Sequence, residues 1–219
     1  MPTPQTRHPN PRLYALVRAA VRLLLRLLTR TEIRGSENVP PRGPYIILTN
    51  HLSAIDPPLI MAVFPSPITV FAGHTHRHEF IVGAVMNALG AIWVRRGEVD
   101  REALRTAIDV LKGGGILGVA PEGTRSRTGG LLTGKIGAAY LATRADIPLI
   151  PVALVGTEIG LPALFRLGRP HITVIIGPPF RLQNPSPHAN RKELEAHTEL
   201  IMRTLAAMLP EKYRGAYRD

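Results

Sequence analysis

Residues 45–58 read YIILTNHLSAIDPP, which passes from an apolar run through a short polar loop to a proline-marked helix start. The run Tyr45–Thr49 is rich in β-branched and aromatic residues, a composition typical of a buried strand. Asp56 precedes two prolines, and an aspartate followed by proline is a common helix N-cap. The stretch therefore predicts a strand, a loop and a helix in succession.

Short strands and helices alternate through the chain after Arg30. This alternation predicts an α/β fold with a largely parallel central sheet flanked by helices. Functional residues of such sheets gather on the loops beyond the carboxyl ends of the strands, so we expect the site there. Further strands are expected at residues 68–72, 92–94, 116–119, 149–155 and 172–176, and helices at about 59–64, 79–89, 101–111, 136–144 and 190–209.

The composition narrows the class of protein. The chain has 219 residues, 45% of them hydrophobic, which suits one α/β domain with a sizeable core. It has no cysteine, and this excludes disulfides, thiolate catalysis and cysteine-based zinc sites and fits a cytoplasmic protein. No secretory signal is expected, because arginines interrupt the N-terminal apolar stretch about every fourth residue.

The positive charge is concentrated at the N-terminus. The formal net charge is +11, and residues 1–30 hold six arginines and no acidic residue. From Leu13 to Arg30 the arginines recur every four residues among Leu, Val and Ala, with no uncharged run long enough to span a bilayer. We therefore predict an amphipathic membrane-interface helix within a membrane-association segment, residues 1–30, that precedes the main domain, residues 31–219.

Two alternatives remain open for this segment. One is a core helix that packs on the domain and leaves a solvated arginine stripe. The other is a nucleic-acid-binding helix, which the near absence of aromatic and polar base-reading residues disfavours. We expect an anionic membrane surface as the partner and no nucleic acid.

His51 and Asp56 form the first candidate pair. The strand ends just before His51, and a loop of four residues can fold the Asp56 carboxylate back onto the imidazole. The carboxylate would fix the tautomer, so that the other ring nitrogen can take a proton from a substrate hydroxyl. A loop histidine without a catalytic role is the alternative.

A second candidate lies after the strand at residues 116–119, in the sequence APEGTRSR. Gly123 permits a tight turn with positive φ, and Arg125 offers a planar fork to a phosphate, with Thr124 adding a hydroxyl donor. Glu122 could form an ion pair with Arg125 or accept a hydrogen bond from a substrate hydroxyl. The alternative is a polar turn with solvated arginines.

Two further segments border the expected site. Residues 90–97 read GAIWVRRG and place paired arginines at a strand end, where they could bind substrate or simply discourage edge-to-edge aggregation. Residues 147–156 read IPLIPVALVG and predict a buried strand that walls the site.

Together and in this order, the four segments resemble the glycerolipid acyltransferase superfamily, and within it the 1-acylglycerol-3-phosphate acyltransferases. Asn50-His51 with Asp56 resembles its N-H-x4-D block, and residues 90–96 its G-x-I-F-x-x-R block. Residues 121–126 match its P-E-G-T-R-S block, and residues 150–152 resemble its hydrophobic-proline block. The stretch KIGAA at residues 135–139 is also similar, and the resemblance covers about residues 31–180.

The resemblance implies residue roles and an activity. It implies His51 as the base with Asp56 as its partner, and Arg96, Glu122, Gly123 and Arg125 around the acceptor phosphate. The implied reaction moves a fatty acyl group from acyl-CoA or acyl-carrier protein to the free hydroxyl of 1-acylglycerol-3-phosphate, giving phosphatidic acid in phospholipid biosynthesis. The thioester is a co-substrate, and no cofactor or metal is expected. The expected location is the cytoplasmic face of the cell membrane, as a peripheral or monotopic protein.

The chain departs from the family pattern in three places. Ala120 stands where Phe is frequent, which makes that wall roomier, and Trp93 replaces a smaller aromatic residue. The stretch before Phe80 lacks the lysine of many members and instead alternates His74, His76 and His78, which could share one face of a strand. A metal site there is conceivable, and a polar segment at the site mouth is the alternative.

Other acceptors and one other class of function remain open. The same chemistry could act on glycerol-3-phosphate, on another lysophospholipid or on an acylated amino-acid lipid. A non-catalytic membrane-surface binding module would need only the basic helix, and the intact histidine and glutamate blocks argue against it.

Overall fold

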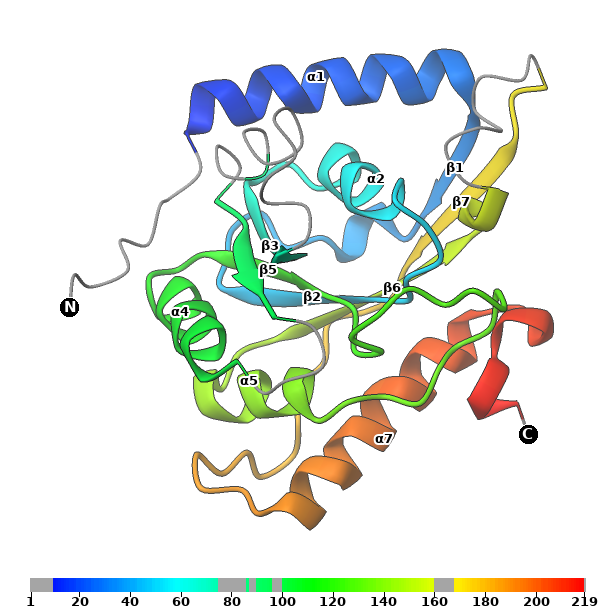
Figure 1. Ribbon diagram of the computed structural model, residues 1–219. Coiled ribbons are helices and arrows are strands. Elements are labelled where there is room, and N and C mark those ends of the chain that lie inside the picture. Colours follow the sequence, from blue (N-terminus) through cyan, green and yellow to red (C-terminus); the bar gives the residue numbers. More distant parts are fainter. Residues whose placement is uncertain (1–9, 75–85, 87–89, 96–99, 160–167, 219) are drawn as a thin grey trace.

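The computed structural model describes residues 10–74, 86, 90–95, 100–159 and 168–218. Within them it confirms the predicted α/β fold (Figure 1). The strands are β1 (Arg30–Arg34), β2 (Tyr45–Thr49), β3 (Ile68–Gly73), β4 (Ile92–Val94), β5 (Ile116–Val119), β6 (Leu149–Val155) and β7 (His171–Ile176). The helices are α1 (Pro11–Leu28), α2 (Asp56–Val63), α4 (Arg101–Lys112), α5 (Gly137–Ala145) and α7 (Arg191–Met208).

One seven-stranded sheet, in the order β1-β7-β6-β2-β5-β3-β4, forms the middle layer. The paired strands run parallel except for β6 and β7, which are antiparallel. Strand β2 lies between β5 and β6, and its residue Leu48 pairs with Val119 of β5. The loops that leave the carboxyl ends of β2 and β5 therefore begin side by side, which brings together segments about 70 residues apart in the sequence.

Helices cover both faces of this sheet. Figure 1 shows α1 and α2 on one face and α4, α5 and α7 on the other. The side chains of β2 alternate accordingly, with Ile46 and Leu48 in the core beside α5 and α7, and Tyr45 and Ile47 in the core beside α2. Both faces are apolar because both are covered, as is usual for a parallel sheet.

The element boundaries agree closely with the sequence predictions, with two differences. The expected helix at residues 79–89 lies outside the described residues, apart from Met86. Strand β1 was not predicted, because its sequence RTEIR has a single large apolar residue, and its strand structure depends on pairing with β7 at the sheet edge. As a result, Arg30 belongs to the sheet rather than to the N-terminal helix.

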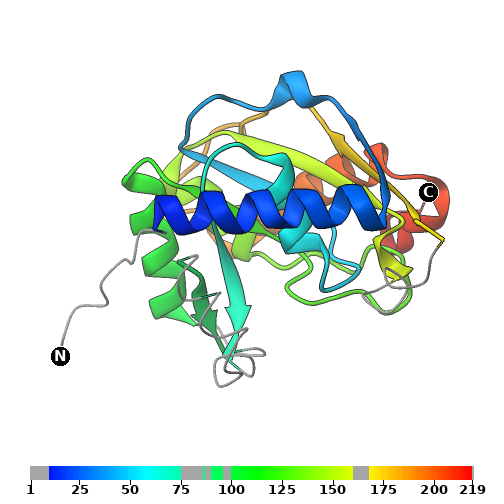
Figure 2. The ribbon, with the colours of Figure 1, turned by 90° about the horizontal axis from the view of Figure 1, so that it is seen from above.

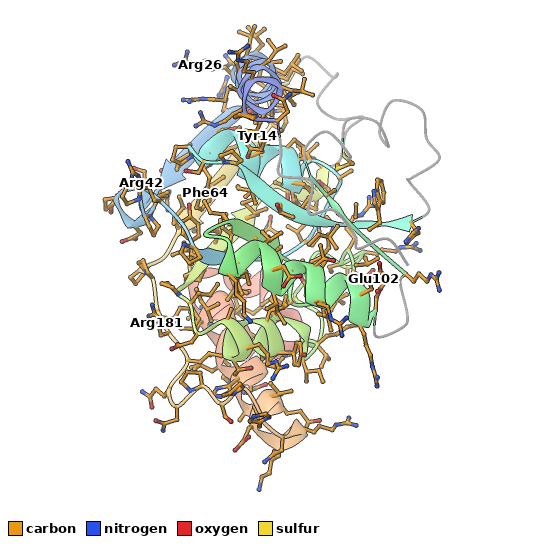
Figure 3. The ribbon with its side chains drawn as sticks, turned by 90° about the vertical axis from the view of Figure 1, so that its left-hand side faces the viewer. Tyr14, Arg26, Arg42, Phe64, Glu102 and Arg181 are labelled. Atoms are coloured by element: carbon orange, nitrogen blue, oxygen red, sulfur yellow. The ribbon has the colours of Figure 1, made fainter. Side chains whose placement is uncertain are left out.

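Helix α1 packs on the domain along one face. Tyr14 is buried at 3% exposure against Met61 of α2, and its hydroxyl accepts the N–H of Ile68 at 3.3 Å. Arg169 binds the opposite end of the helix and donates to the carbonyls of Arg26 at 2.8 Å and Thr29 at 3.1 Å. Figures 2 and 3 show α1 lying over α2, and Figure 3 shows Tyr14 on the inner side of α1 and Arg26 on its outer side.

The rest of the α1 surface is unusual for a packed helix. Leu16, Leu23 and Leu27 are 67%, 59% and 61% exposed, so a second apolar strip faces away from the core. Arg22 and Arg26 are exposed beside it, whereas Arg18 turns inward and donates to the carbonyl of Met61 at 3.2 Å. Among the described helices, none is both long and apolar enough to cross a membrane.

Candidate active site

The structure brings His51 and Asp56 together at the carboxyl end of β2. Nδ1 of His51 lies 2.8 Å from Oδ2 of Asp56, and the two side chains are 20% and 2% exposed. A carboxylate can only accept, so the contact requires a proton on Nδ1; a ring with a single proton then keeps its lone pair on Nε2. This is the tautomer that a general base requires.

Asp56 does not cap its helix in the predicted way. It is the first residue of α2, the cap position belongs to Ile55, and no side chain caps the helix. Its Oδ2 atom instead accepts the N–H groups of Leu52 at 2.7 Å and Ser53 at 2.8 Å, in addition to the imidazole. The N-cap prediction is therefore wrong, because the carboxylate turns back into the loop rather than toward the helix N-terminus.

Glu122 holds the backbone of His51. Its Oε1 atom accepts the N–H of His51 at 2.9 Å, and its Oε2 atom accepts the N–H of Leu132 at 2.8 Å. The carbonyl of His51 in turn accepts the N–H of Ser126 at 2.7 Å. Both backbone groups of the catalytic candidate are thus fixed by the loop after β5.

The observed partners of Glu122 differ from the ion pair with Arg125 that the sequence suggested. Glu122 is 1% exposed and spends both oxygens on backbone N–H groups, while Arg125 is exposed and has no hydrogen bond or ion pair with any described residue. Burial raises the pKa of Glu122 above its ordinary value, and the N–H groups of Leu132 and His51 oppose that shift. The role of substrate ligand stays a prediction for Glu122, and its observed contacts are those of an internal support.

The turn after Glu122 adopts a left-handed backbone conformation at Gly123. Gly123 has a φ of 67°, a left-handed value at which other residues are strained. A Cβ atom at this position would also lie 2.9 Å from Cδ of Lys135, so the lysine side chain lies directly over the glycine. Thr124 and Gly123 line the same groove as His51, and Thr124 is exposed.

Lys135 is a site residue that the sequence reasoning did not single out. It lines the groove with His51, and its ammonium group has no hydrogen bond or ion pair within the described part of the chain. Its own N–H donates to the carbonyl of Pro121 at 2.8 Å, which fixes it beside the glycine turn. The signal in the sequence was the stretch KIGAA, which was noted for its resemblance but given no role.

Asn50 is a second residue whose role only the structure reveals. Its amide is buried and bonds both backbone groups of Leu154 on β6, with Nδ2 donating at 2.9 Å and Oδ1 accepting at 2.8 Å. The side chain thereby continues the pairing of β2 with β6 beyond the last residue of the strand. It fixes the point at which the chain turns toward His51.

The remaining predicted residues are only partly described. Arg96 lies outside the described residues, while its neighbour Arg95 is exposed and lines the groove. His76 and His78 also lie outside them, and the ring of His74 lies 6.4 Å from that of Trp93. Among described residues, no group of three or more His, Cys, Asp or Glu side chains is placed to hold a metal ion.

One groove of about 1410 Å³ is lined by His51, Asp56, Arg95, Gly123, Thr124 and Lys135. Arg125 is not among the residues that line it. Beside His51 and Asp56 its wall is apolar and includes Ile47, Ile60 and Val70. Gly118 of β5 also lines it, and a Cβ atom there would lie 3.1 Å from Cγ1 of Val70. Toward α4, α5 and α7 the groove is polar and carries mixed charge. The cations on that side are Arg95, Arg101, Arg105, Lys112, Arg144 and Arg191, and the acids are Asp100, Asp109, Glu195 and Glu199.

Comparison with known proteins agrees with this geometry. Residues 30–155, more than half of the chain, match the family model Acyltransferase. The chain belongs to the Acyltransferase family. The match spans every described element of the candidate site, from β2 through Lys135 to β6.

Three proteins similar to this acyltransferase-family chain are named as acyltransferases of acylated glycerol phosphates. This chain is 31% identical over 148 residues to a 1-acyl-sn-glycerol-3-phosphate acyltransferase of Borreliella burgdorferi. The match covers 66% of this chain but only 59% of that protein. A protein of the same name from Bacillus subtilis is 27% identical over 86% of this chain and 93% of its own length. The crystal structure of the 1-acyl-sn-glycerophosphate acyltransferase of Thermotoga maritima superposes with a TM-score of 0.67 at 27% identity, and covers 89% of this chain and 80% of that one.

The first prediction concerns the catalytic pair. We expect His51→Ala to lower turnover by roughly 10²–10⁴-fold, because the general base is lost, and Asp56→Asn to lower it strongly through the wrong tautomer. Steady-state rates measure the activity of the variants, and circular dichroism shows whether they are folded. His171→Ala, which removes a surface imidazole that is 62% exposed, is the control and should leave the rate unchanged. A folded His51→Ala protein with a near-normal rate would contradict the mechanism.

The second prediction concerns the buried carboxylate. Because the pKa of Glu122 is raised in the folded chain above 4.5, ionising it costs stability as the pH rises from that value through the folded pKa. Glu122→Gln removes the titration. We therefore expect the melting temperature of the wild type, relative to that of Glu122→Gln, to fall with rising pH across this window and to level off above it. Paired thermal melts test this, and a difference that does not vary with pH would refute it.

Proposed function

We propose that the protein transfers a fatty acyl group from a thioester to the free hydroxyl of 1-acylglycerol-3-phosphate, giving phosphatidic acid. The observation that carries the proposal is the His51–Asp56 pair, at 2.8 Å, in one groove with the Gly123 turn and Lys135. The names of the relatives support this acceptor. A purely non-catalytic module would have no use for an oriented imidazole beside a phosphate-binding turn.

The chemistry follows from the orientation of His51. Nε2 takes the proton of the acceptor hydroxyl as its oxygen forms a bond to the thioester carbonyl carbon. Asp56 stabilises the imidazolium that results, through the hydrogen bond to Nδ1. The tetrahedral intermediate then breaks its carbon–sulfur bond, and the leaving sulfur receives the proton from His51. An ester and a free thiol result, and the base returns to its neutral form.

The acceptor phosphate would bind at the turn after Glu122. Arg125 and Lys135 supply positive charge, and neither is neutralised by a described acidic residue. Gly123 has no Cβ atom that would collide with the side chain of Lys135, so the lysine can lie across the turn. Thr124 adds a hydroxyl donor. A phosphate held here and a hydroxyl at Nε2 would fix the acceptor at two points, which converts binding energy into positioning.

The apolar wall of the groove would take the acyl chains. Ile47, Ile60 and Val70 line it next to the catalytic pair, so a chain can lie along the sheet while its carbonyl group lies at His51. Burial of each methylene group contributes about 0.8 kcal/mol, which favours a long acyl chain over a short one. Acyl-CoA and acyl-carrier protein both present such a chain, and the proposal includes either as donor, with no cofactor.

The third prediction tests the acceptor. Purified protein with radiolabelled acyl-CoA is assayed against 1-acylglycerol-3-phosphate, glycerol-3-phosphate, other lysophospholipids and phosphate-free 1-acylglycerol. We expect turnover of 1-acylglycerol-3-phosphate to exceed the others, and Arg125→Lys and Lys135→Met to raise its KM by roughly threefold to tenfold. Lys192→Met, which removes an exposed lysine of α7, should leave the KM unchanged. Preferred use of glycerol-3-phosphate, or equal losses with the phosphate-free acceptor, would overturn the assignment.

We also propose that α1 places the enzyme on an anionic membrane surface as a peripheral or monotopic protein. The exposed strip of Leu16, Leu23 and Leu27, with Arg22 and Arg26 beside it, has the composition of an interfacial helix. The leucines would enter the acyl region of the lipid while the arginines reach its phosphates. The helix would thus be shared between the domain core and the lipid surface, on the cytoplasmic face.

The fourth prediction tests the lipid-facing strip without disturbing the packed one. Deletion of residues 1–30 would remove Tyr14 from the core, so substitution is the cleaner change. We expect Leu16, Leu23 and Leu27 changed together to Ser to release the protein from anionic vesicles at any salt concentration. Arg22→Gln with Arg26→Gln should weaken binding mainly at low salt, because charge attraction is screened.

Vesicle sedimentation measures both effects, with matched assays on a membrane-embedded and a short-chain soluble acceptor. The leucine variant should lose activity on the embedded acceptor and keep it on the soluble one. Leu200→Ser, at an exposed leucine of α7, is the matched control for the surface change. Full sedimentation of the leucine variant would show that α1 is not the anchor.

A further inference from the structure

The loop between β5 and α5, residues 120–136, carries two contacts on which the site depends. The N–H of Leu132 donates to Glu122, whose other oxygen holds the backbone of His51. The N–H of Lys135 donates to the carbonyl of Pro121, which places the lysine over the glycine turn. The position of residues 131–135 therefore determines whether Glu122 can hold the backbone of His51, and it also determines where the ammonium group of Lys135 lies.

The C-terminal tail, residues 210–218, lies against this loop. The N–H of Leu131 donates to the carbonyl of Tyr213 at 2.9 Å, and the N–H of Ala216 donates to the carbonyl of Leu131 at 2.9 Å. Leu131 is thus paired on both sides with the tail and is buried at 3% exposure. The tail thus binds the backbone of Leu131, and the next residue, Leu132, is the one that donates to Glu122.

Tyr217 adds a contact through its side chain. Its hydroxyl accepts the N–H of Gly134, the residue before Lys135, at 3.0 Å. Its ring is 8% exposed and lines the same groove as His51. Gly134 is also confined from the other side, because a Cβ atom there would lie 2.5 Å from Cγ of Met202 on α7. The backbone that leads into the lysine is therefore enclosed by the tail and by α7.

We propose that Tyr217 is a positioning residue of the active site, whose hydroxyl acts through Gly134 on the place of Lys135. The inference rests on the proposed function, in which Lys135 binds a substrate phosphate. A lysine side chain is long and flexible, so the region that its ammonium can reach depends on where its backbone is held. Fixing that backbone before the substrate arrives lowers the ordering cost of binding, which is the advantage of preorganisation.

A second tyrosine provides a matched control. The Tyr14 hydroxyl, like that of Tyr217, accepts one backbone N–H from a distant segment, in this case Ile68 at 3.3 Å, and the residue is buried. The hydroxyl also donates to the carbonyl of Ser66 at 3.4 Å. It lies between α1 and α2, far along the chain from the loop that carries Lys135. Both Tyr14→Phe and Tyr217→Phe remove a hydroxyl that accepts a distant backbone N–H, and Tyr14→Phe removes the long bond to Ser66 as well. A purely structural role therefore predicts consequences for Tyr14→Phe at least as large as those for Tyr217→Phe.

The experiment is a double-mutant cycle with the full-length protein. Tyr217→Phe, Lys135→Met, the double variant and Tyr14→Phe are compared by thermal melting and by steady-state kinetics on a soluble short-chain acceptor. We expect Tyr217→Phe to raise the KM of the phosphate-bearing acceptor by about twofold to tenfold with a smaller change in kcat, and Tyr14→Phe to change neither. On the Lys135→Met background, Tyr217→Phe should change the KM by less than about twofold, because the group it positions is gone.

Two results would overturn the proposal. One is a Tyr217→Phe protein whose kinetics match those of Tyr14→Phe. The other is a Tyr217→Phe effect that is fully retained without the lysine, which would mean that the hydroxyl acts on the site by another route.

A comparison of substrates identifies the phosphate. The KM effect should appear with the acceptor phosphate and vanish with phosphate-free 1-acylglycerol; if it follows acyl-CoA but not acyl-pantetheine, Lys135 binds a donor phosphate instead. A second measurement does not need turnover: titration with inorganic phosphate should show weaker binding in Tyr217→Phe and Lys135→Met than in the wild type and Tyr14→Phe. Equal phosphate binding by all four proteins would refute the positioning role, even if no acceptor of the panel were acylated.

Discussion

The carboxylate of Glu122 has to accept two backbone N–H groups, because a buried charge without partners costs several kcal/mol. The donors come from His51, after β2, and from Leu132, in the loop after β5. These segments begin side by side because β2 and β5 pair in parallel, with Leu48 opposite Val119. The register of two strands thus determines whether the carboxylate can be satisfied, and the satisfied carboxylate fixes the backbone of His51, the proposed base.

The two carboxylates of the site share a feature that bears on catalysis. The Oδ2 atom of Asp56 is bound by the imidazole of His51 and by two N–H groups of its own loop, while Oδ1 is buried without a hydrogen-bond partner among the described residues. Glu122 is bound by backbone N–H groups alone. Neither has an arginine or lysine partner among the described residues. Lys135, which lines the groove, and Arg125, on the exposed turn after Glu122, are therefore not neutralised by either carboxylate. An ion pair between Glu122 and Arg125, which the sequence allowed, would have neutralised one of them.

The sequence predicts the structural features that depend on residues close together along the chain. The apolar runs located the central strands, and the spacing from His51 to Asp56 predicted their contact. It did not predict β1, whose charged sequence becomes a strand only beside β7. The support by Glu122, the pairing of Asn50 with Leu154 and the contact of the tail with Leu131 join segments far apart, and no local pattern reports such contacts.

Helix α1 shows why a periodic pattern alone left two interpretations open. Its inner strip, with Tyr14 against Met61, is that of a packed helix, and its leucine strip is that of an interfacial one. A helix has room for both because its circumference takes an apolar strip on either side of a charged one. Since α2 begins at Asp56 and packs against α1, the helix that carries the proposed lipid-facing strip contacts the helix that carries the partner of His51. Two packed helices thus connect the proposed lipid surface to the catalytic candidates.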